Sequence, residues 1–597
     1  MTQHSHAPQS ADLSFRNAVA RTHHPLGRIA VLTSPLWLAF ALTGCGAQED
    51  GEVSAADDPA IPEELSCDGA DTFDPAECPA SYPEWACVVH VDGEAATSGD
   101  GWSWQSPVRT VQEGIDRAHC GATRSGLCST WQVWVKEGRY FVHQGCDSDT
   151  VRLRAGVEVY GGFVGVEDRL TERDWATHET ILDGRDGPDA TAHVRHVVLG
   201  ADDATVDGVT ITGGLAGGSD EPTERCGAGM LNVQSSPVVQ NCTFRDNVAF
   251  DHGGGMANLD RSSPTVAGCQ FEENQAAQSG GAMANRQESE PDVSNSAFVG
   301  NLAGDSGGAV SSHESALQVT GCTFRDNEAV RRGGGMSSRL GSATVTGATF
   351  VGNLAHKGGG LDLEHCAATV TDSTFAANDT YFAVYDDTED PTGQGAGLWI
   401  GGGTVSLVGN RVVDNTAFHS GGGLYATGGA EVELINAVVA GNQAGVGAGL
   451  ASDGAAALSV VNCTVVGNVA EDSGGGIVGF DDLTVANSIL WHNLPDQVAA
   501  VGTHSLSVTF SNVAGGHAGQ GNLGSDLQAD EPRFGDVSGG DLTLLDGSPG
   551  IDAADGAQAP ATDLAGHERV DDPSTPNGSA CGAACADMGA FEFQPGG

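Results

Sequence analysis

Basic residues are scarce in this chain of 597 residues. Lysine and arginine together number 26, against 79 aspartate and glutamate residues, so the formal net charge is −53. A surface with this charge repels phosphate backbones and anionic lipid headgroups. We therefore expect no nucleic-acid partner and no electrostatic attachment to a membrane. The acidic excess instead predicts a soluble, self-repelling surface that attracts cations or basic groups.

Several motifs of common functional sites are also missing from the sequence. No C-x-x-C pair has the spacing of a zinc site, and no H-E-x-x-H motif joins any of the 19 histidines. The glycine-rich strings are not followed by the lysine of a P-loop, and no strand–helix–strand pattern surrounds them. These absences disfavour a zinc centre and a nucleotide-binding loop.

No apolar run is long enough to predict a membrane-spanning helix with assurance. The run Ile29–Leu42 is interrupted by Pro35 and is shorter than the roughly 20 residues that a span needs. Three arginines precede the run and Leu42-Thr43-Gly44-Cys45 ends it, which is the layout of a secretory signal. The tetrad resembles the bacterial lipobox, which implies that Cys45 receives diacylglycerol on its thiol and becomes the mature N-terminus. An ordinary signal peptide with a chance cysteine is the alternative.

Glycine, in contrast, is abundant, with 87 residues, and a glycine-rich turn recurs through the middle of the chain. The turns follow one another at steps of 25 to 27 residues, except for one step of 37. A fixed period of this size predicts a solenoid in which each repeat is one stacked unit. The turns end at Met230, Met256, Met283, Val310, Met336, Leu361, Leu398, Leu424, Leu450 and Ile477.

Each repeat carries a second motif, an apolar residue followed three positions later by asparagine. Strands of neighbouring coils lie about 4.8 Å apart, so residues at one position of the repeat should form a ladder. We expect the phenylalanines to stack inward, and the asparagine amides to bond to one another while their backbone takes left-handed geometry. The ladder residues are Phe244, Phe271, Phe298, Phe324, Phe350 and Phe375, with Asn247, Asn274, Asn301, Asn327, Asn353 and Asn378.

Three parts of the chain resemble known families. The pairing of F-x-x-N with the glycine turn resembles the polymorphic outer membrane protein repeats of chlamydial surface proteins. The segments VDGEAATSGDGWSWQSPVRTVQEGIDRA and YGGFVGVEDRLTERDW resemble the opening of bacterial right-handed parallel β-helix proteins. SPGIDAADGAQAPATDLAGHERV, followed by DMGAFEF, resembles the choice-of-anchor Q domain. Together they imply an all-β, single-stranded, right-handed parallel β-helix of the pectin lyase-like type.

These features divide the chain into five parts. We expect a lipoprotein signal peptide over 1–44, a disordered acidic tether over 45–84, and an N-terminal cap with the first rungs over 85–182. Helical spacing over Val108–Ala118 predicts a helix that covers the open apolar end of the solenoid. The β-helix repeats occupy 183–500, and the last rungs with a choice-of-anchor Q-like C-terminal cap occupy 501–597.

The chain has 15 cysteines, and without Cys45 the remaining 14 could pair fully in an oxidising compartment. Cys242 and Cys269 lie on adjacent rungs, two residues before the ladder phenylalanine, so we expect a thiol ladder or a disulfide. Cys322, two rungs beyond Cys269, is too far away to bridge it. Cys581 and Cys585 could close a small loop. Six early cysteines allow 15 pairings and stay unassigned: Cys67, Cys78, Cys87, Cys120, Cys128 and Cys146.

The single long step marks a candidate ligand loop between Phe375 and Leu398. Aromatic and acidic side chains together suit sugar stacking or oxygen ligation of Ca²⁺, although no EF-hand spacing is present and a solvated acidic loop is the alternative. Ca²⁺ is the one cofactor that we consider, and whether a metal binds is left open. The loop residues are Tyr381, Tyr385, Asp386, Asp387, Glu389 and Asp390.

No complete catalytic set stands out in the sequence. Acidic pairs occur at Asp202-Asp203 and Asp481-Asp482, and Asp251-His252-Gly253 superficially resembles part of the polygalacturonase motif, whose other signatures are missing. Arg331-Arg332 is an exception to the lack of basic residues in the repeats, and we place it at a turn. If no place on the rungs has three or more acidic groups facing a basic one, adhesion is favoured.

We therefore expect an exported, lipid-anchored, monomeric protein of the bacterial cell envelope, at the outer membrane or cell surface, that acts in adhesion or surface display. Its partner would be a polysaccharide or another cell-surface ligand. The alternatives are a polysaccharide lyase or glycoside hydrolase of the pectin lyase-like fold, or non-catalytic carbohydrate binding.

Overall fold

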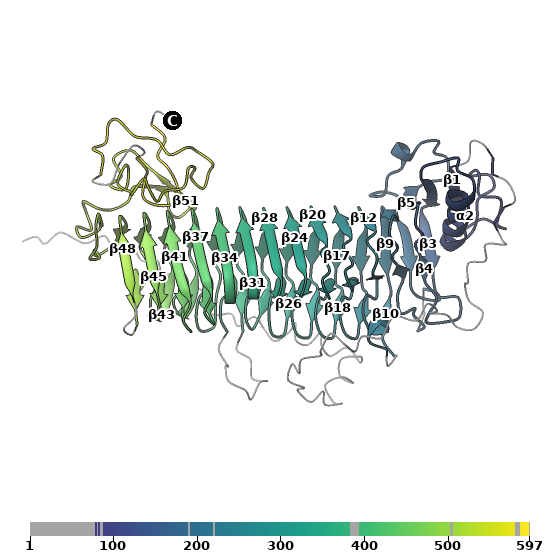
Figure 1. The fold of residues 1–597 in the computed structure, drawn as a ribbon, viewed down its shortest axis with the longest axis horizontal. Helices are drawn as coiled ribbons and strands as arrows, with labels where there is room; N and C mark the ends of the chain where they lie inside the picture. The colour runs from purple at the N-terminus through teal and green to yellow at the C-terminus, as the bar shows by residue number, and fades with distance from the viewer. Residues whose placement is uncertain are drawn as a thin grey trace, which may run out of the picture. The chain divides into compact units, whose positions relative to one another are not determined.

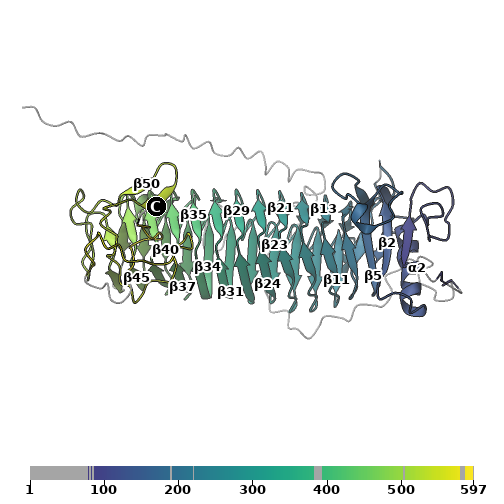
Figure 2. The ribbon, with the colours of Figure 1, turned by 90° about the horizontal axis from the view of Figure 1, so that it is seen from above.

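The computed structural model describes residues 78–79, 82–83, 87–188, 191–218, 221–381, 393–501, 505–578 and 585–595. The chain separates into two units, residues 1–63 and 64–597, and all described residues belong to the second. In this second unit, parallel strands stack coil upon coil along one axis (Figures 1 and 2). The expected signal peptide, Cys45 and most of the tether lie outside the described residues.

Each repeat of about 26 residues forms one coil with up to four short strands. One coil comprises β15 (Met256–Leu259), β16 (Thr265–Ala267), β17 (Gln270–Glu272) and β18 (Gln275–Ala276). Each strand pairs in parallel with its counterpart in the next coil. The predicted all-β parallel β-helix is confirmed.

The strands of successive coils form three long sheets. The first and second strands of each coil join a 26-stranded sheet, and the fourth strands of seven coils form a seven-stranded sheet. The third strands form a 14-stranded sheet: β3 (Gly138–Phe141), β6 (Thr180–Asp183), β9 (Val209–Thr212), β13 (Thr243–Arg245), β17, β21 (Ala297–Val299), β25 (Thr323–Arg325), β29 (Thr349–Val351), β32 (Thr374–Ala376), β35 (Arg411–Val413), β38 (Val438–Ala440), β42 (Thr464–Val466), β46 (Ile489–Trp491) and β49 (Asn512–Val513).

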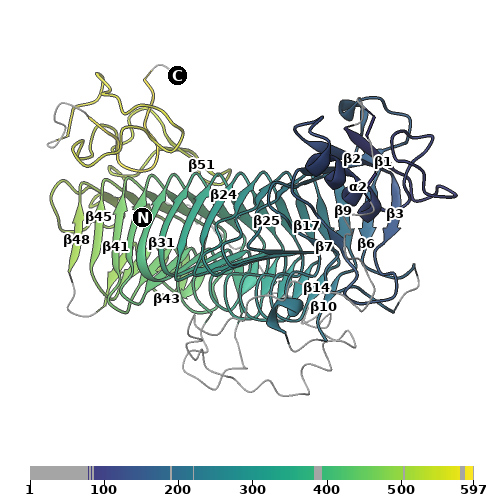
Figure 3. The same ribbon diagram turned by 45° about the vertical axis from the view of Figure 1, so that its right-hand side comes forward.

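A helix closes the N-terminal end of the stack, as predicted. Helix α2 (Val111–Arg124) begins after Thr110, whose hydroxyl accepts a hydrogen bond from the backbone N–H of Glu113 at 3.1 Å. It lies against β1 (Val88–Val91) and β2 (Trp131–Lys136) at the end of the coil stack (Figure 3). The helix extends one and a half turns beyond the predicted Ala118, because the apolar spacing alone does not mark where it ends.

The glycine turns combine two backbone requirements. The first glycine of each turn is left-handed, as at Gly280 with φ 69°, where a side chain would be strained. At the second, a Cβ on Gly281 would lie 2.3 Å from the carbonyl oxygen of Gly308 in the next coil. The glycines therefore allow both the corner and the close approach of coils that the sequence predicted.

The phenylalanine ladder forms inside the solenoid. Rings from Phe244 to Phe375 stack on one another with centroids 4.5 to 4.9 Å apart and nearly parallel planes. All six rings are fully buried. The spacing equals the coil repeat, so one contact is copied along the axis.

The asparagine ladder also forms, with one correction. Asn274 Nδ2 donates to Asn301 Oδ1 at 3.1 Å and to the carbonyl of Phe244 at 2.9 Å, and the pattern repeats along the ladder. The left-handed residue is the one before each asparagine, as at Glu273 with φ 52° and Asp326 with φ 55°. The preceding residue turns the corner, which leaves the asparagine side chain directed inward as a bonding group.

The cysteines fall into two groups. Cys78–Cys120 and Cys87–Cys128 are disulfides in the N-terminal cap, and Cys146 and Cys585 are bonded to partners outside the described residues. Full pairing of the remaining cysteines is wrong, because six are free and buried: Cys226, Cys242, Cys269, Cys322, Cys366 and Cys463. Cys242 and Cys269 thus take the thiol form of the predicted ladder. The two cysteines form no disulfide, and the Sγ atom of each donates to a backbone carbonyl.

The C-terminal segment leaves the coils and folds back on the outer side of the 14-stranded sheet. It contains β50 (Phe534–Asp536) and β51 (Asp541–Leu544), and otherwise consists of loops. In Figure 1 it lies beside the last coils. Three asparagine side chains at the corners of those coils donate to its backbone carbonyls: Asn436 to Thr562, Asn462 to Asp587 and Asn487 to Asp555.

Among the described residues, no helix has the length and apolar character that crossing a membrane requires.

Candidate functional site

Functional side chains gather on one outer face, which we call the outer stripe. In the first strand of each coil, the first and third residues point into the core, so the second and fourth point outward. The residue just before the glycine turn forms a third row beside them. The strands of the stripe are β11 (Met230–Val233), β15, β19 (Met283–Arg286), β23 (Val310–His313), β27 (Met336–Arg339), β31 (Leu361–Thr371), β34 (Leu398–Val408), β36 (Leu424–Thr427), β40 (Leu450–Ser452) and β44 (Ile477–Gly479).

A charged cluster occupies the middle of the stripe. Asp362 and Glu364 are the second and fourth residues of β31, and Arg332 precedes a glycine turn of the coil before. Arg332 Nη1 lies 2.7 Å from Glu364 Oε1, and Arg339 also pairs with Glu364. Asp362 is fully buried and accepts a hydrogen bond from Ser337 Oγ at 2.9 Å. Its Oδ2 has no hydrogen-bond partner within the described part of the chain.

The two carboxylates of this cluster have different acidities. Burial raises the pKa of Asp362 to about 6, against the opposing charge of Arg332. Burial acts in the same direction on Glu364, but the charges and hydrogen bonds of Arg332 and Arg339 outweigh it and hold its pKa below the usual value. Two carboxylates on one strand face therefore differ in protonation near pH 5 to 6, which is the property that acid–base chemistry uses.

The same cluster bears on the expectation that a place with three or more acidic groups facing a basic one would distinguish catalysis from adhesion. Burial lowers the pKa of Arg332, and the charges of Asp362, Glu364 and Asp305 more than offset it, so that the pKa is raised. Three acidic groups thus act on Arg332, and Arg339 is a second basic group beside them. The lack of such a place would have favoured adhesion. Because one is present, both adhesion and catalysis stay open.

Aromatic residues continue the stripe in the next two coils. Trp399 is in register with Asp362, and Tyr425 is in register with Trp399. Arg332 Cζ and Lys357 Nζ lie 5.3 and 5.5 Å from the centre of the Trp399 ring, which is cation–π geometry. The row therefore passes from carboxylate to indole to phenol over three coils.

The predicted ligand loop lies mostly outside the described residues. Tyr385, Asp386, Asp387, Glu389 and Asp390 are not described, so Ca²⁺ binding there stays a prediction.

Tyr381 is described, and its hydroxyl donates to the backbone carbonyls of Ala329 and Val330. Tyr381 therefore ties the loop to an earlier coil, and its hydroxyl is not directed at a ligand.

The other residues singled out from the sequence are divided between turns and the stripe. Asp202, Asp481 and Asp482 accept hydrogen bonds at corners between coils. Arg331 is exposed at its turn and pairs with Asp305 at 3.5 Å, whereas its neighbour Arg332 points into the charged cluster. The corner pairs are therefore structural.

Asp362 and Glu364 were missed in the sequence. One signal could have revealed them: at the second position of the first strand, earlier repeats carry Ala257, Ala284 and Ser311, which are small. A carboxylate at such a position has a cost unless something pairs with it. The partner, Arg332, lies 30 positions earlier, where only the coil geometry brings it close.

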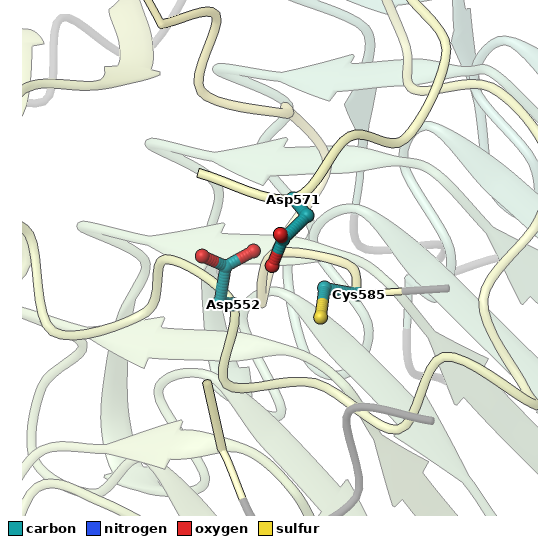
Figure 4. Close-up of side chains that lie close together, drawn as sticks. All are labelled: Asp552, Asp571 and Cys585. Atoms are coloured by element: carbon teal, nitrogen blue, oxygen red, sulfur yellow. The ribbon is translucent and has the colours of Figure 1, made fainter. Parts of the chain in front are cut away.

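A possible metal group in the C-terminal segment does not fit a metal. Ligand atoms of Asp552, Asp571 and Cys585 lie within 4.8 Å of one another (Figure 4). Cys585, however, is in a disulfide, and its Sγ accepts a hydrogen bond from Asn577 Nδ2 at 3.0 Å. A disulfide sulfur is not a thiolate ligand. The predicted partner, Cys581, lies outside the described residues, so this bond stays a prediction.

A family model matches part of the repeat region and supports the fold. Residues 196–390 match the family described as a right handed beta helix region. The A-module of the mannuronan C-5 epimerase AlgE6 of Azotobacter vinelandii is 14% identical, with coverage of 69% of this chain and 93% of that one and a TM-score of 0.28. The tailspike protein of E. coli bacteriophage HK620, in complex with a pentasaccharide, is 12% identical, with coverage of 72% and 71% and a TM-score of 0.25. No curated protein sequence matches the chain.

Proposed function

We propose that this protein is an exported, lipid-anchored β-helical protein of the bacterial cell envelope that binds an extended ligand along its outer stripe, in adhesion or surface display. The observation that carries this proposal is the stripe itself. Its residues repeat in register from coil to coil. The second-position residues Asp362, Trp399 and Tyr425 are buried, at 0%, 5% and 5% exposure, whereas fourth-position residues such as Arg286 and Arg339 are partly exposed and can meet a ligand.

The coil geometry suits a polymer better than a compact ligand. Equivalent side chains recur about every 4.8 Å along the axis, so a chain lying along the stripe meets a new set of contacts at each coil. Charged and aromatic groups together are the contacts that saccharide chains use in protein sites. A polysaccharide or glycan of a cell surface is therefore the ligand class that we favour.

Catalysis on such a polymer is the second candidate, and the Arg332 cluster favours it. Asp362 and Glu364 differ in acidity, as a general acid and base would. The side chain of Asp362 has no exposed surface, however, so a substrate does not reach it in this state. The binding proposal therefore rests on the partly exposed residues of the stripe, such as Arg286 and Arg339, and not on the buried Asp362.

A glycan-array screen followed by product analysis separates these functions. The full chain is applied to immobilised glycans, and any bound glycan is then incubated with the protein and analysed for shortened or modified chains. Binding without a product supports adhesion or display. Cleavage or modification of the glycan would support the enzyme class instead. Binding to no glycan would contradict both functions.

The lipid anchor has its own test in cells that process lipoproteins. Because diacylglycerol is attached through the Cys45 thiol, Cys45→Ser should move the exported protein from the detergent phase to the aqueous phase in Triton X-114 partitioning. Cys67→Ser, outside the lipobox, is the matched control and should stay in the detergent phase. Equal partitioning of Cys45→Ser and the unaltered chain would mean that Cys45 is not the anchor.

A further inference from the structure

A second charged group lies on the outer stripe, in the coils directly before the Arg332 cluster, and it is cationic. Arg286 is the last residue of β19 and stands in register with His313 of β23. His252 precedes the glycine turn that begins at Gly253, and Arg225 ends the short 3-10 helix η4 (Pro222–Arg225). These four residues, the Arg286 cluster, come from four successive coils.

Coil geometry brings these residues together: His252 and Arg286 occupy the repeat positions that Arg332 and Glu364 occupy further along the stripe, where the two side chains lie 2.7 Å apart. Burial lowers the pKa of His252 well below its usual value, and the positive charges of Arg286, His313 and Arg225 lower it further. Asp251 is the acidic group that interacts with this cluster, and it is already engaged by Arg225 at 3.0 Å and by Gln278 at 3.0 Å. The cluster therefore holds more positive than negative charge, in a chain whose acidic residues outnumber basic ones by 79 to 26.

The unusual member is Arg286. Its guanidinium has neither an ion pair nor a hydrogen bond within the described part of the chain, and its side chain is half-buried. The other stripe arginines are paired: Arg225 with Asp251, and Arg332 and Arg339 with Glu364. Two more polar atoms of the cluster, His252 Nδ1 and Arg225 Nε, are buried with no hydrogen-bond partner among the described residues. A buried polar group without a partner destabilises the fold, so a ligand that supplies a partner is favoured.

The Arg332 cluster shows what would satisfy these groups. There, the protein places its own carboxylates at the second and fourth positions of β31, and these bind Arg332 and Arg339. In β19 the second position is Ala284, and the fourth is Arg286 itself. The anionic partner that the protein supplies to the Arg332 cluster is therefore not supplied by β19, and a ligand can take its place.

We propose that the Arg286 cluster binds an oxyanion, the carboxylate or sulfate group of an acidic saccharide chain. This proposal rests on the proposed function and adds a ligand chemistry to it. The planar guanidinium of Arg286 is suited to a two-oxygen acceptor, and His252 and His313 offer ring N–H groups beside it. Arg225 adds positive charge, part of which is offset by its ion pair with Asp251.

The test measures binding of full-length protein to four probes by calorimetry: polygalacturonate, chondroitin sulfate, neutral dextran and inorganic sulfate. We expect salt-sensitive binding of at least one acidic polysaccharide, weakened at least tenfold by Arg286→Gln. Arg286→Lys, which keeps the charge but not the fork, should recover part of the affinity. Arg261→Gln is the matched control, since Arg261 is an exposed arginine at a corner of the preceding coil, and it should bind as the unaltered chain does.

The outcomes separate this proposal from the proposed function. Equal binding of acidic probes by Arg286→Gln and Arg261→Gln, with both variants folded by circular dichroism, would overturn the oxyanion site. Binding of dextran alone would also overturn it and would leave the proposed glycan-binding function standing. Thermal stabilisation by inorganic sulfate that disappears in Arg286→Gln would support the oxyanion site even if no polysaccharide binds.

Discussion

At the scale of single residues, the two inner ladders have different tasks. Burying a phenylalanine side chain contributes about 1.5–3 kcal/mol, and stacking adds about 0.5–1.5 kcal/mol, so each ring contributes more to stability than a single hydrogen bond does. The net gain from an asparagine hydrogen bond is nearer 1 kcal/mol. The asparagines matter more for register, because a slipped coil leaves several buried amide and backbone groups without partners.

Replacing one ladder asparagine should therefore cost more than its hydrogen bonds are worth. In Asn301→Leu, the backbone N–H of Asn274 loses its acceptor at 3.0 Å and the carbonyl of Phe271 loses its donor at 2.9 Å. We expect a loss of about 3 kcal/mol in the free energy of unfolding, measured by urea denaturation. Glu288→Leu, at an exposed corner, is the control. A loss no larger than in that control would show that the ladder is dispensable.

The free thiols give a second prediction at this scale. Cys242 and Cys269 are almost fully buried, each 1% exposed, and burial raises the pKa of the Cys269 thiol well above its usual value. Oxidation needs an accessible thiolate, so both should remain reduced in the folded chain. Alkylation of the protein unfolded without reductant, followed by peptide mass spectrometry, should label both. A cross-linked Cys242–Cys269 peptide would contradict the structure.

At the scale of elements, the C-terminal segment is held together by buried carboxylates. Arg569 Nη1 pairs with Glu592 Oε2 at 2.8 Å, and both side chains are buried. Asp587 accepts hydrogen bonds from the backbone N–H groups of Asp552 and Phe593. In a segment with one short pair of strands, these carboxylates satisfy backbone groups that a sheet would otherwise pair.

This arrangement predicts a pH dependence for the segment. Burial, reinforced by the charge of Glu592, raises the pKa of Asp587 to about 8, and burial raises that of Asp552 to about 6. An unfolded aspartate has a pKa of about 3.9, so between about pH 4 and 8 the folded segment holds protons that the unfolded one releases. Its stability should fall as pH rises through this window and level off above about pH 8. Arg569 is the cation that faces the carboxylates.

Hydrogen exchange of residues 545–578 and 585–593, compared at pH 5 and pH 8.5 after correction for intrinsic rates, measures this dependence. We expect weaker protection at pH 8.5, while the coils of residues 230–380 serve as the internal reference. Stronger protection of the segment at pH 8.5 would show that its carboxylates are ionised when folded.

How far the sequence predicts each element depends on where its contacts come from. The phenylalanine ladder was predictable because each contact joins the same position of successive repeats, and the period fixes that position. The Arg332 cluster was not, because Arg332 and Glu364 occupy different positions of two coils, although Arg339 and Glu364 share one position. The corner geometry was misplaced by one residue, onto Asn274 instead of Glu273, since both residue types occur at turns.

At the scale of the whole molecule, charge is distributed unevenly. The chain as a whole is strongly acidic, yet the outer stripe gathers Arg225, Arg286, Arg332, Arg339 and Lys357 on one face. Asp251, Asp362 and Glu364 lie among these cations, so the stripe is mixed in charge, and we expect an anionic polymer to be attracted mainly where Arg286 lies. Because the stripe runs along the length of the solenoid, it suits the proposed binding of an extended ligand at the cell surface.

Glycan-array binding by arginine variants of two successive coils tests the central claim, that the outer stripe is the binding face. Arg339 lies on the stripe at the end of β27, and Arg325 is exposed on β25, in the 14-stranded sheet. The account predicts that Arg339→Gln loses at least tenfold of the array signal and that Arg325→Gln keeps it. Equal binding by both variants, or loss only in Arg325→Gln, would contradict the assignment of the outer stripe.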